Sequence, residues 1–264
     1  GVYSNSLNGK FIWDDKYLIT DNRFIYDYSN VAKIFIKDTE AGSGGKSNFY
    51  RPLQIFSYMV DYSLWKLDAR GYHLTSITLH ILVALCIYWL IQILFKDQVF
   101  SLLVSIIFVV HPIHTVVVSY ISTRADLLAF LFILFSFIFY LKILRAQNLI
   151  LCILMIFSYA LALLSKENSL ILPALILLYH FSFKEKIKLK TFVPIAGVAF
   201  IYVVLRMTLL KSMLSNVSSS TTLLQRIPGF FVAITNYLKL MVLPFDPHVE
   251  YGLPLFKFTH PQVI

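Results

Sequence analysis

Charged residues and cysteines are scarce in this sequence. Asp, Glu, Lys and Arg make up 14% of the 264 residues, whereas a soluble domain is typically about one quarter charged. The two cysteines, Cys86 and Cys152, lie in apolar segments, so we expect small buried hydrophobic residues and no disulfide framework. A signal-peptide pattern is also missing, and the first residue is glycine. We therefore expect a fragment that lacks a first membrane span.

Apolar residues are correspondingly abundant, at 58% of the chain, and the mean hydropathy is +0.72. They gather in long runs almost without charge, which is typical of transmembrane helices and not of a large soluble core. The net charge of +9 fits loops that face the cytoplasm and anionic membrane lipid. No basic stripe lies outside the membrane pattern, so no nucleic-acid partner is expected.

The chain divides into a polar part and a membrane part. Residues 1–70 are polar and aromatic, and we expect an extracytoplasmic loop with short helices and a mobile Gly/Ser-rich segment at 41–47. Residues 71–264 are expected to form an all-α, polytopic transmembrane bundle with an outer Ser/Thr-rich loop near 211–224. Segment 227–243 is either a further span or a helix in the membrane interface. The other spans are expected at about 72–95, 98–111, 126–140, 149–164, 169–183 and 192–210.

The basic residues predict the orientation of the bundle. One set of alternate connecting segments is rich in lysine and arginine, and the positive-inside rule places this set in the cytoplasm. Residues 1–70 and all the candidate polar motifs then share the outer face. The cytoplasmic set is Lys96, Lys142, Arg145, Lys184, Lys186, Lys188 and Lys190, and the opposite set is Arg124, Lys166 and Lys211.

Two adjacent carboxylates, Asp14 and Asp15, follow Trp13 in the polar part. A carboxylate can accept the proton of a hydroxyl that attacks an oxocarbenium-like sugar carbon. A solvated loop or a helix cap would also explain the pair. The catalytic candidates are Asp14 and Asp15, with Asp14 slightly preferred as the base.

Three basic residues on the expected outer face are candidates for binding a phosphate. Arg51 precedes a short helix that Pro52 begins, and it would either hold a phosphate with two hydrogen bonds or snorkel at the interface. Arg124 lies at the start of a span on the outer face, where the positive-inside rule disfavours a basic residue. An anionic ligand bound at the N-terminus of this helix would explain its presence. Lys166 would join the same site or form a salt-bridged turn with its neighbour Glu167.

The other candidates are mainly histidines near the starts of the spans. His80 lies two turns inside the first span, where an ionisable side chain tends to face a cavity. His111 and His114 have metal-ligand spacing, but no Cys or carboxylate nearby completes a set, so no metal site is expected. Structural hydrogen bonds would also explain the histidines. A favourable position in the first turn of a helix would also explain Asp126. The candidate substrate-binding residues are Tyr72, His73, His80, His111, His114, Asp126 and Glu167.

Six short motifs together resemble a known family. Their sequence and their order along the chain are similar to those of the membrane half of the transmembrane and tetratricopeptide-repeat O-mannosyltransferases and their bacterial relatives. That family belongs to the GT-C superfamily of lipid-dependent glycosyltransferases. The motifs are FIWDD, YRPL, GYH, HPIHT, RADLL and LSKE, at 11–15, 50–53, 71–73, 111–115, 124–128 and 164–167.

The resemblance implies a GT-C type bundle with an extracytoplasmic active site. There, mannose or another hexose would move with inversion from a polyprenyl-phosphate donor to a Ser or Thr hydroxyl of an acceptor protein. The family's acidic motif maps onto Asp14 and Asp15. No cofactor is implied besides this lipid donor, and a divalent metal is not indicated. The family's C-terminal repeats are missing, which leaves the acceptor open, and the residue usage suggests a bacterial inner membrane with a periplasmic site.

Two other classes of function are also compatible with the sequence. A lipid-carrier transporter predicts two pseudo-repeats of spans with polar residues at mid-membrane, and no such repeat is visible. A non-catalytic membrane scaffold with the same fold would be favoured by loss of the carboxylates, and both are present.

Overall fold

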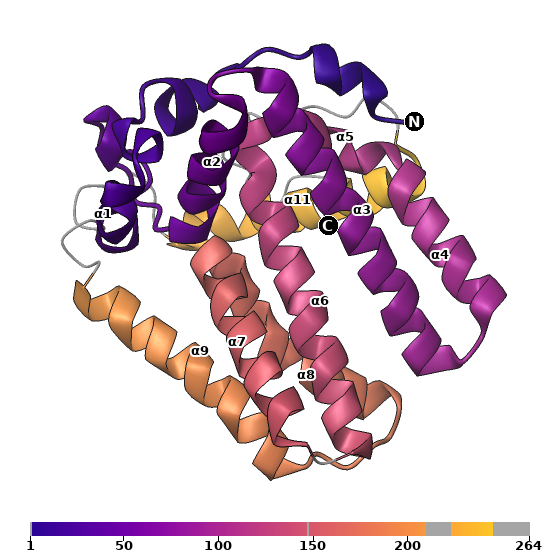
Figure 1. The fold of residues 1–264 in the computed structure, drawn as a ribbon. Helices are drawn as coiled ribbons and strands as arrows, with labels where there is room; N and C mark the ends of the chain where they lie inside the picture. The colour runs from indigo at the N-terminus through magenta and orange to yellow at the C-terminus, as the bar shows by residue number, and fades with distance from the viewer. Residues whose placement is uncertain (1, 147, 210–222, 245–264) are drawn as a thin grey trace.

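The structure is a computed structural model that describes residues 2–146, 148–209 and 223–244. Within these ranges the regular secondary structure is helical, without a β-strand. The helices of residues 69–209 form a bundle, and residues 2–65 form a cap over one of its ends (Figure 1). The all-α membrane bundle expected from the sequence is confirmed.

Three of the bundle helices begin at side-chain caps that the sequence supplies. The Asp68 carboxylate accepts the backbone N–H of Arg70, and Asp97 and Asn148 cap the starts of two later helices in the same way. Lys96, with a φ of 57°, ends the first helix in the left-handed region. The helices are α3 (Ala69–Phe95), α4 (Gln98–Val110), α5 (Thr115–Ser119), α6 (Arg124–Arg145), α7 (Leu149–Ser165), α8 (Leu172–Ser182) and α9 (Leu189–Leu209).

Fewer described helices can cross a membrane by themselves than the sequence pattern suggested. Three are long and apolar enough, namely Ala69–Phe95, Ile121–Arg145 and Leu189–Thr208. A fourth candidate, α4 with the following short helices, is bent by 50° after Val110, where Pro112 begins a new turn. The expected spans at 149–164 and 169–183 are instead the shorter helices α7 and α8, of 17 and 11 residues. These lengths of roughly 25 Å and 16 Å fall short of a hydrocarbon core about 30 Å thick.

Helix α6 lies at the centre of the bundle, between α3 and α7 (Figure 1). Val83 of α3 packs with Ile138 of α6 in one apolar cluster. Tyr140 of α6 packs with Met155 and Leu163 of α7 in another. The N-terminus of α6 therefore lies at the centre of the capped end of the bundle.

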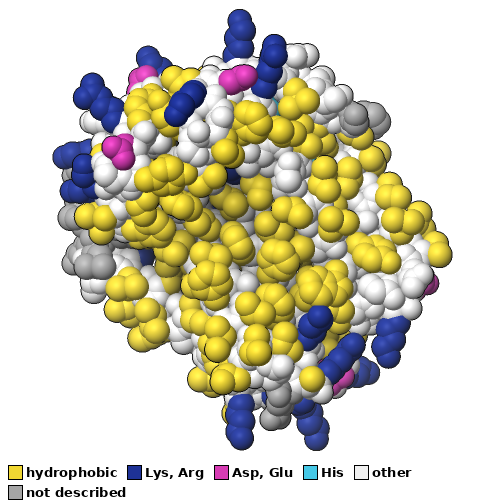
Figure 2. Space-filling model, viewed as in Figure 1, with side chains coloured by type: hydrophobic (Ala, Val, Ile, Leu, Met, Phe, Trp, Pro, Cys, Tyr) yellow, Lys and Arg dark blue, Asp and Glu magenta, His cyan; other side chains and the backbone are white. Residues whose placement is uncertain are grey.

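The surface is divided into bands, as expected for a membrane protein. Figure 2 shows a broad apolar middle zone, with Lys and Arg side chains gathered at the two ends. Exposed side chains such as Leu85, Ile107 and Phe157 supply this apolar zone. Exposed apolar side chains gathered in one zone mark an interaction surface, and a bilayer would cover this one.

The N-terminal cap has an apolar core of its own. Ile19, Ile25, Ile34 and Tyr58 are buried in it. Within the Gly/Ser-rich segment, expected to be a mobile loop, Gly42 is buried, and a Cβ there would lie 1.8 Å from Oδ1 of Asn22. The cap helices are η1 (Ser4–Asn8), η2 (Lys16–Thr20), η3 (Arg23–Tyr26), η4 (Tyr28–Asn30), α1 (Val31–Ile36), η5 (Ala41–Ser43) and α2 (Pro52–Trp65).

The last described helix, α11 (Leu223–Val242), runs across the bundle and not along it (Figure 1). Its end lies at the capped end, because Nε2 of His111 is 3.1 Å from the Met241 carbonyl oxygen. Of the two sequence interpretations of segment 227–243, this direction favours the interfacial helix. The expected Ser/Thr-rich loop near 211–224 lies almost entirely outside the described residues.

Candidate functional site

The acidic motif packs on the start of α6. The Asp15 carboxylate accepts hydrogen bonds from the Ser122 hydroxyl and from the Ile12 backbone N–H, the latter at 3.0 Å. Only 1% of Asp15 is exposed. The Tyr3 hydroxyl donates to the His111 carbonyl at 3.4 Å, which ties the cap to the break after α4. The structure thus brings the acidic motif, His111 and the start of α6 to one end of the bundle.

Asp14, in contrast, is exposed and held by a constrained backbone. Trp13 has a φ of 44°, a region that bulky residues rarely occupy. The Trp13 ring makes an edge contact with the Tyr120 ring, with centroids 5.8 Å apart. The Asp14 backbone N–H donates to the Tyr120 hydroxyl at 3.2 Å. Backbone strain of this kind persists where surrounding contacts impose it, often at functional sites. Here the contacts of Trp13 and of the Asp14 backbone with Tyr120 fix the position of Asp14.

The surroundings separate the roles of the two carboxylates. Burial raises the pKa of Asp15, although its hydrogen bonds with Ile12 and Ser122 oppose this shift. Burial also raises the pKa of the Tyr120 phenol, and the charge of Asp14 adds to that shift. Asp15 is therefore buried against Ser122 at the start of α6, whereas Asp14 is exposed at the surface.

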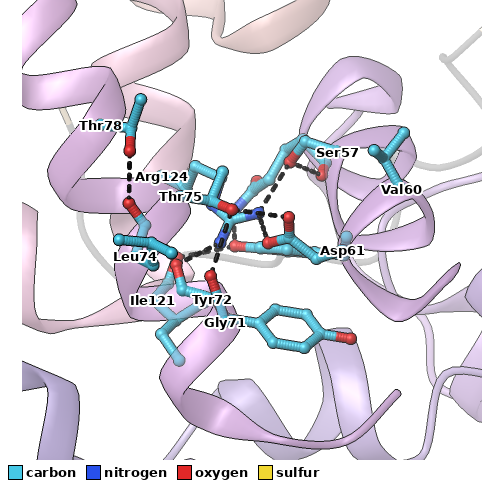
Figure 3. A network of polar contacts seen from close by, with 12 residues as sticks. Ser57, Val60, Asp61, Gly71, Tyr72, Leu74, Thr75, Thr78, Ile121 and Arg124 are labelled. Atoms are coloured by element: carbon cyan, nitrogen blue, oxygen red, sulfur yellow. Dashed lines mark hydrogen bonds and ion pairs between the residues drawn. The ribbon is translucent and has the colours of Figure 1, made fainter. Parts of the chain in front are cut away.

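Arg124 pairs with a buried carboxylate, Asp61, which is not among the site residues expected from the sequence. Its Nη1 lies 2.5 Å from Oδ2 of Asp61 in α2, and the arginine side chain is 0% exposed. Its Nη2 donates to the Tyr72 carbonyl at 2.8 Å, and the Thr75 hydroxyl donates to Asp61 at 2.7 Å. Figure 3 shows Asp61 and Arg124 facing each other between these groups. The Tyr58 ring covers the guanidinium, 4.7 Å from its centroid.

This pairing changes the expected role of Arg124. A donor phosphate would have to displace Asp61 and enter a site that has no exposed arginine surface. Burial raises the pKa of Asp61, while Arg124 and Thr75 oppose the shift. We therefore no longer expect Arg124 to contact a phosphate, and interpret it as the link between α2, α3 and α6. The signal in the sequence was that Asp61 is the only charged residue of α2.

Lys166 and Asp126 stand at a largely apolar pocket of about 310 Å³ between α4, α5, α6 and the turn η8 (Glu167–Ile171). Nζ of Lys166 lies 2.5 Å from Oδ1 of Asp126, and both side chains remain partly exposed. His114, Phe108 and Phe130 also line the pocket. The pocket therefore combines an apolar wall with an accessible cation.

A second ion pair lies beside this pocket. Arg51 donates to both carboxylate oxygens of Glu167, at 3.3 and 3.0 Å. Arg206 of α9 approaches the same carboxylate at 4.0 Å. Burial by itself raises the pKa of Glu167, but the hydrogen bonds and charge of Arg51 and the charge of Arg206 outweigh it, so the pKa lies below its usual value. Arg206 is not among the site residues expected from the sequence, although an arginine inside an apolar helix often marks a functional site.

Four of the described histidines lie near the cap, namely His73, His80, His111 and His114, and the first two are buried. A Cβ at Gly9 would lie 2.5 Å from Nε2 of His73, so the cap closes directly over this ring. His80 stacks on Phe108 with centroids 5.0 Å apart, and the His114 ring is 5.6 Å from His80. Among the described residues, no three His, Cys, Asp or Glu side chains are grouped closely enough to hold a metal ion. Of the histidines in the described residues, only His114 lines the Lys166 pocket.

Comparison with known proteins gives consistent relatives. The chain is similar to protein O-mannosyl-transferase TMTC3 of Mus musculus, with 27% identity over 269 residues that cover 99% of this chain. It is 31% identical over 67% of its length to TMTC3 of Homo sapiens. It is 33% identical over 64% of its length to protein O-mannosyl-transferase F38B6.6 of Caenorhabditis elegans. The chain spans 28%, 20% and 24% of the lengths of these relatives, respectively. No family model and no solved structure matches the chain.

Proposed function

Because the chain belongs to the family of transmembrane and tetratricopeptide-repeat protein O-mannosyltransferases, we propose that it is a membrane-embedded glycosyltransferase. It moves a hexose from a polyprenyl-phosphate donor to a Ser or Thr hydroxyl of an acceptor protein. The observation that carries this proposal is the fixed, exposed position of Asp14 at the end of an apolar bundle. A lipid-borne donor reaches that position from the membrane.

Asp14 acts as the general base in this reaction. The acceptor hydroxyl oxygen attacks the anomeric carbon of the sugar as its proton passes to the Asp14 carboxylate. The bond between that carbon and the phosphate oxygen breaks, and the anomeric configuration inverts. Asp15 keeps the loop in place through Ser122.

The Lys166 pocket receives the donor. Its apolar wall, including Phe108 and Phe130, suits the first isoprenoid units, and Lys166 suits the phosphate. A phosphate leaving group needs positive charge and no general acid. Arg51 and Arg206 add charge beside the pocket. In this arrangement the phosphate replaces Asp126 as the partner of Lys166.

The catalytic end faces away from the cytoplasm. Nucleotide sugars are cytoplasmic, so an enzyme on the outer face needs a sugar carried across on lipid. Among the short connecting segments of the bundle, the more basic ones lie at the opposite end, with Lys96, Arg145 and segment 184–190, and this supports the direction. In a bacterial cell this places the site on the periplasmic side of the inner membrane.

The proposed function is tested by looking for its product, a protein that carries a hexose on Ser or Thr. Mass spectrometry of periplasmic proteins, from cells with the intact protein and from cells without it, is expected to show a hexose on Ser or Thr residues only in the former. Restoring the gene is expected to restore the modification, whereas restoring an Asp14→Asn form is not. Identical hexose patterns in all strains would support a scaffold and contradict the proposal.

Removal of the Lys166 charge is expected to weaken donor binding. Hydrogen bonds to charged groups are worth about 1.5–3 kcal/mol, so Lys166→Ala is expected to raise the KM for polyprenyl-phosphate mannose roughly tenfold to a hundredfold. Lys166→Arg keeps the charge and is expected to lose less. Lys10→Ala, an exposed change in the cap, is the control. An unchanged donor KM in Lys166→Ala would remove this residue from the donor site.

A further inference from the structure

The end of the bundle opposite Asp14 contains a basic pocket that sugar transfer does not use. The pocket has a volume of about 290 Å³ and lies where the α3–α4 turn, the end of α6 and the segment after α8 meet. Four of its residues are cations and one is a carboxylate: Lys96, Arg145, Lys186, Lys188 and Glu185. Figure 2 shows Lys and Arg side chains gathered at this lower end, directly below the apolar zone.

Two of the cations are held in place by backbone carbonyls. Arg145 donates from Nη2 to the Ile93 carbonyl at 3.0 Å, near the end of α3. Lys188 donates from Nζ to the Leu144 carbonyl at 2.7 Å, near the end of α6. Helix C-terminal carbonyls favour such cations. Each side chain retains further N–H donors, because guanidinium has five and ammonium has three. The charge in the pocket is thus partly preorganised.

The pocket continues toward apolar surface. Leu141, Leu144 and Phe183 form part of its wall. A neighbouring hollow of about 590 Å³ shares Lys188 and adds Lys190 together with Leu149 and Ile187. A ligand that fits both hollows is negatively charged at one end and apolar at the other.

We propose that this pocket binds the phosphate headgroup of an anionic phospholipid from the adjacent leaflet. The headgroup phosphate accepts hydrogen bonds from Arg145, Lys186 and Lys188, and an acyl chain runs along the apolar wall. Basic pockets between membrane helices are suited to anionic headgroups. The site anchors the α3–α4 turn to the segment between α8 and α9, and it does not depend on the proposed sugar transfer.

The test measures lipid binding by the whole purified chain in detergent. Phosphatidylglycerol and phosphatidylcholine are titrated separately, and bound lipid is counted by native mass spectrometry. The double variant Lys96→Gln/Lys186→Gln alters two cations for which no backbone carbonyl contact is seen, so it leaves the helix ends intact. The matched control, Lys10→Gln/Lys37→Gln, removes the same charge from exposed positions of the cap. Melting temperatures of all forms verify folding.

The wild-type chain is expected to prefer phosphatidylglycerol. Each basic residue near an anionic headgroup raises the binding affinity about fivefold. The Lys96→Gln/Lys186→Gln variant is therefore expected to bind phosphatidylglycerol about thirtyfold more weakly than the wild-type chain. The cap control is expected to bind normally. Glu185→Gln removes the one carboxylate among the described residues that line the pocket, and it is expected to bind more tightly.

Three outcomes would overturn the proposal. Equal weakening in the cap control would show diffuse attraction to the total charge and no pocket. Equal affinity for phosphatidylcholine would show that the anionic headgroup is not recognised. Displacement of phosphatidylglycerol by inorganic phosphate at similar concentration would identify a free-phosphate site and not a lipid site.

Discussion

Replacing Asp14 with asparagine is expected to slow sugar transfer about a hundredfold to ten-thousandfold, the usual contribution of a positioned acid or base. Asparagine has nearly the same size, but its amide oxygen cannot take up the proton of the acceptor hydroxyl. The change removes no backbone contact, because the hydrogen bond to Tyr120 comes from the main-chain N–H. The loss should therefore appear in kcat, while the KM for the donor and the melting temperature stay close to wild type.

Two neighbouring variants make this result interpretable. Asp21→Asn changes another exposed carboxylate of the cap and is expected to leave turnover unchanged. Asp15→Ala removes a buried acceptor from Ser122 and Ile12, so it is expected to lower the melting temperature as well as turnover. The assay uses purified protein, polyprenyl-phosphate mannose and a Ser/Thr peptide. Near-normal kcat in Asp14→Asn would exclude Asp14 as the base.

Breaking the Asp61–Arg124 pair is expected to destabilise the protein more than any surface change. Removing one partner of a buried ion pair leaves an uncompensated charge and typically costs about 3–5 kcal/mol. Arg124→Met and Asp61→Leu are each expected to lower the melting temperature strongly. Arg124→Lys is expected to fail as a replacement, because one ammonium cannot match the planar contacts to Asp61 and Tyr72.

The double variant distinguishes a structural role from phosphate binding. If Arg124 only links the helices, Arg124→Met/Asp61→Leu should recover much of the stability lost in either single variant, because no charge remains unpaired. Its donor KM should then be close to wild type. Arg70→Met, an exposed change at the start of α3, is the control. A stable double variant with greatly weakened donor binding would restore the phosphate role to Arg124.

Part of the fold and of the site could be read from local patterns. The spans Ala69–Phe95 and Leu189–Thr208 follow from apolar run length, and Asp68, Asp97 and Asn148 mark helix starts as capping residues do. Apolar run length predicts spans at 149–164 and 169–183, where the structure has the short helices α7 and α8, because apolar runs show composition and not where a helix ends. The composition of the Gly/Ser-rich segment predicts a mobile loop, but it does not reveal that Gly42 packs against Asn22.

The sequence alone determined the class of protein, the helical bundle and, through its ordered motifs, the family. Those properties depend on hydropathy and on neighbours in the chain. Only the tertiary structure decided that Asp15 is buried against Ser122 while Asp14 is exposed, and that Arg124 is paired with Asp61. These partners come from segments far apart in the chain. Their contacts exist because the cap and α6 bury apolar surface together, and no local pattern encodes that packing.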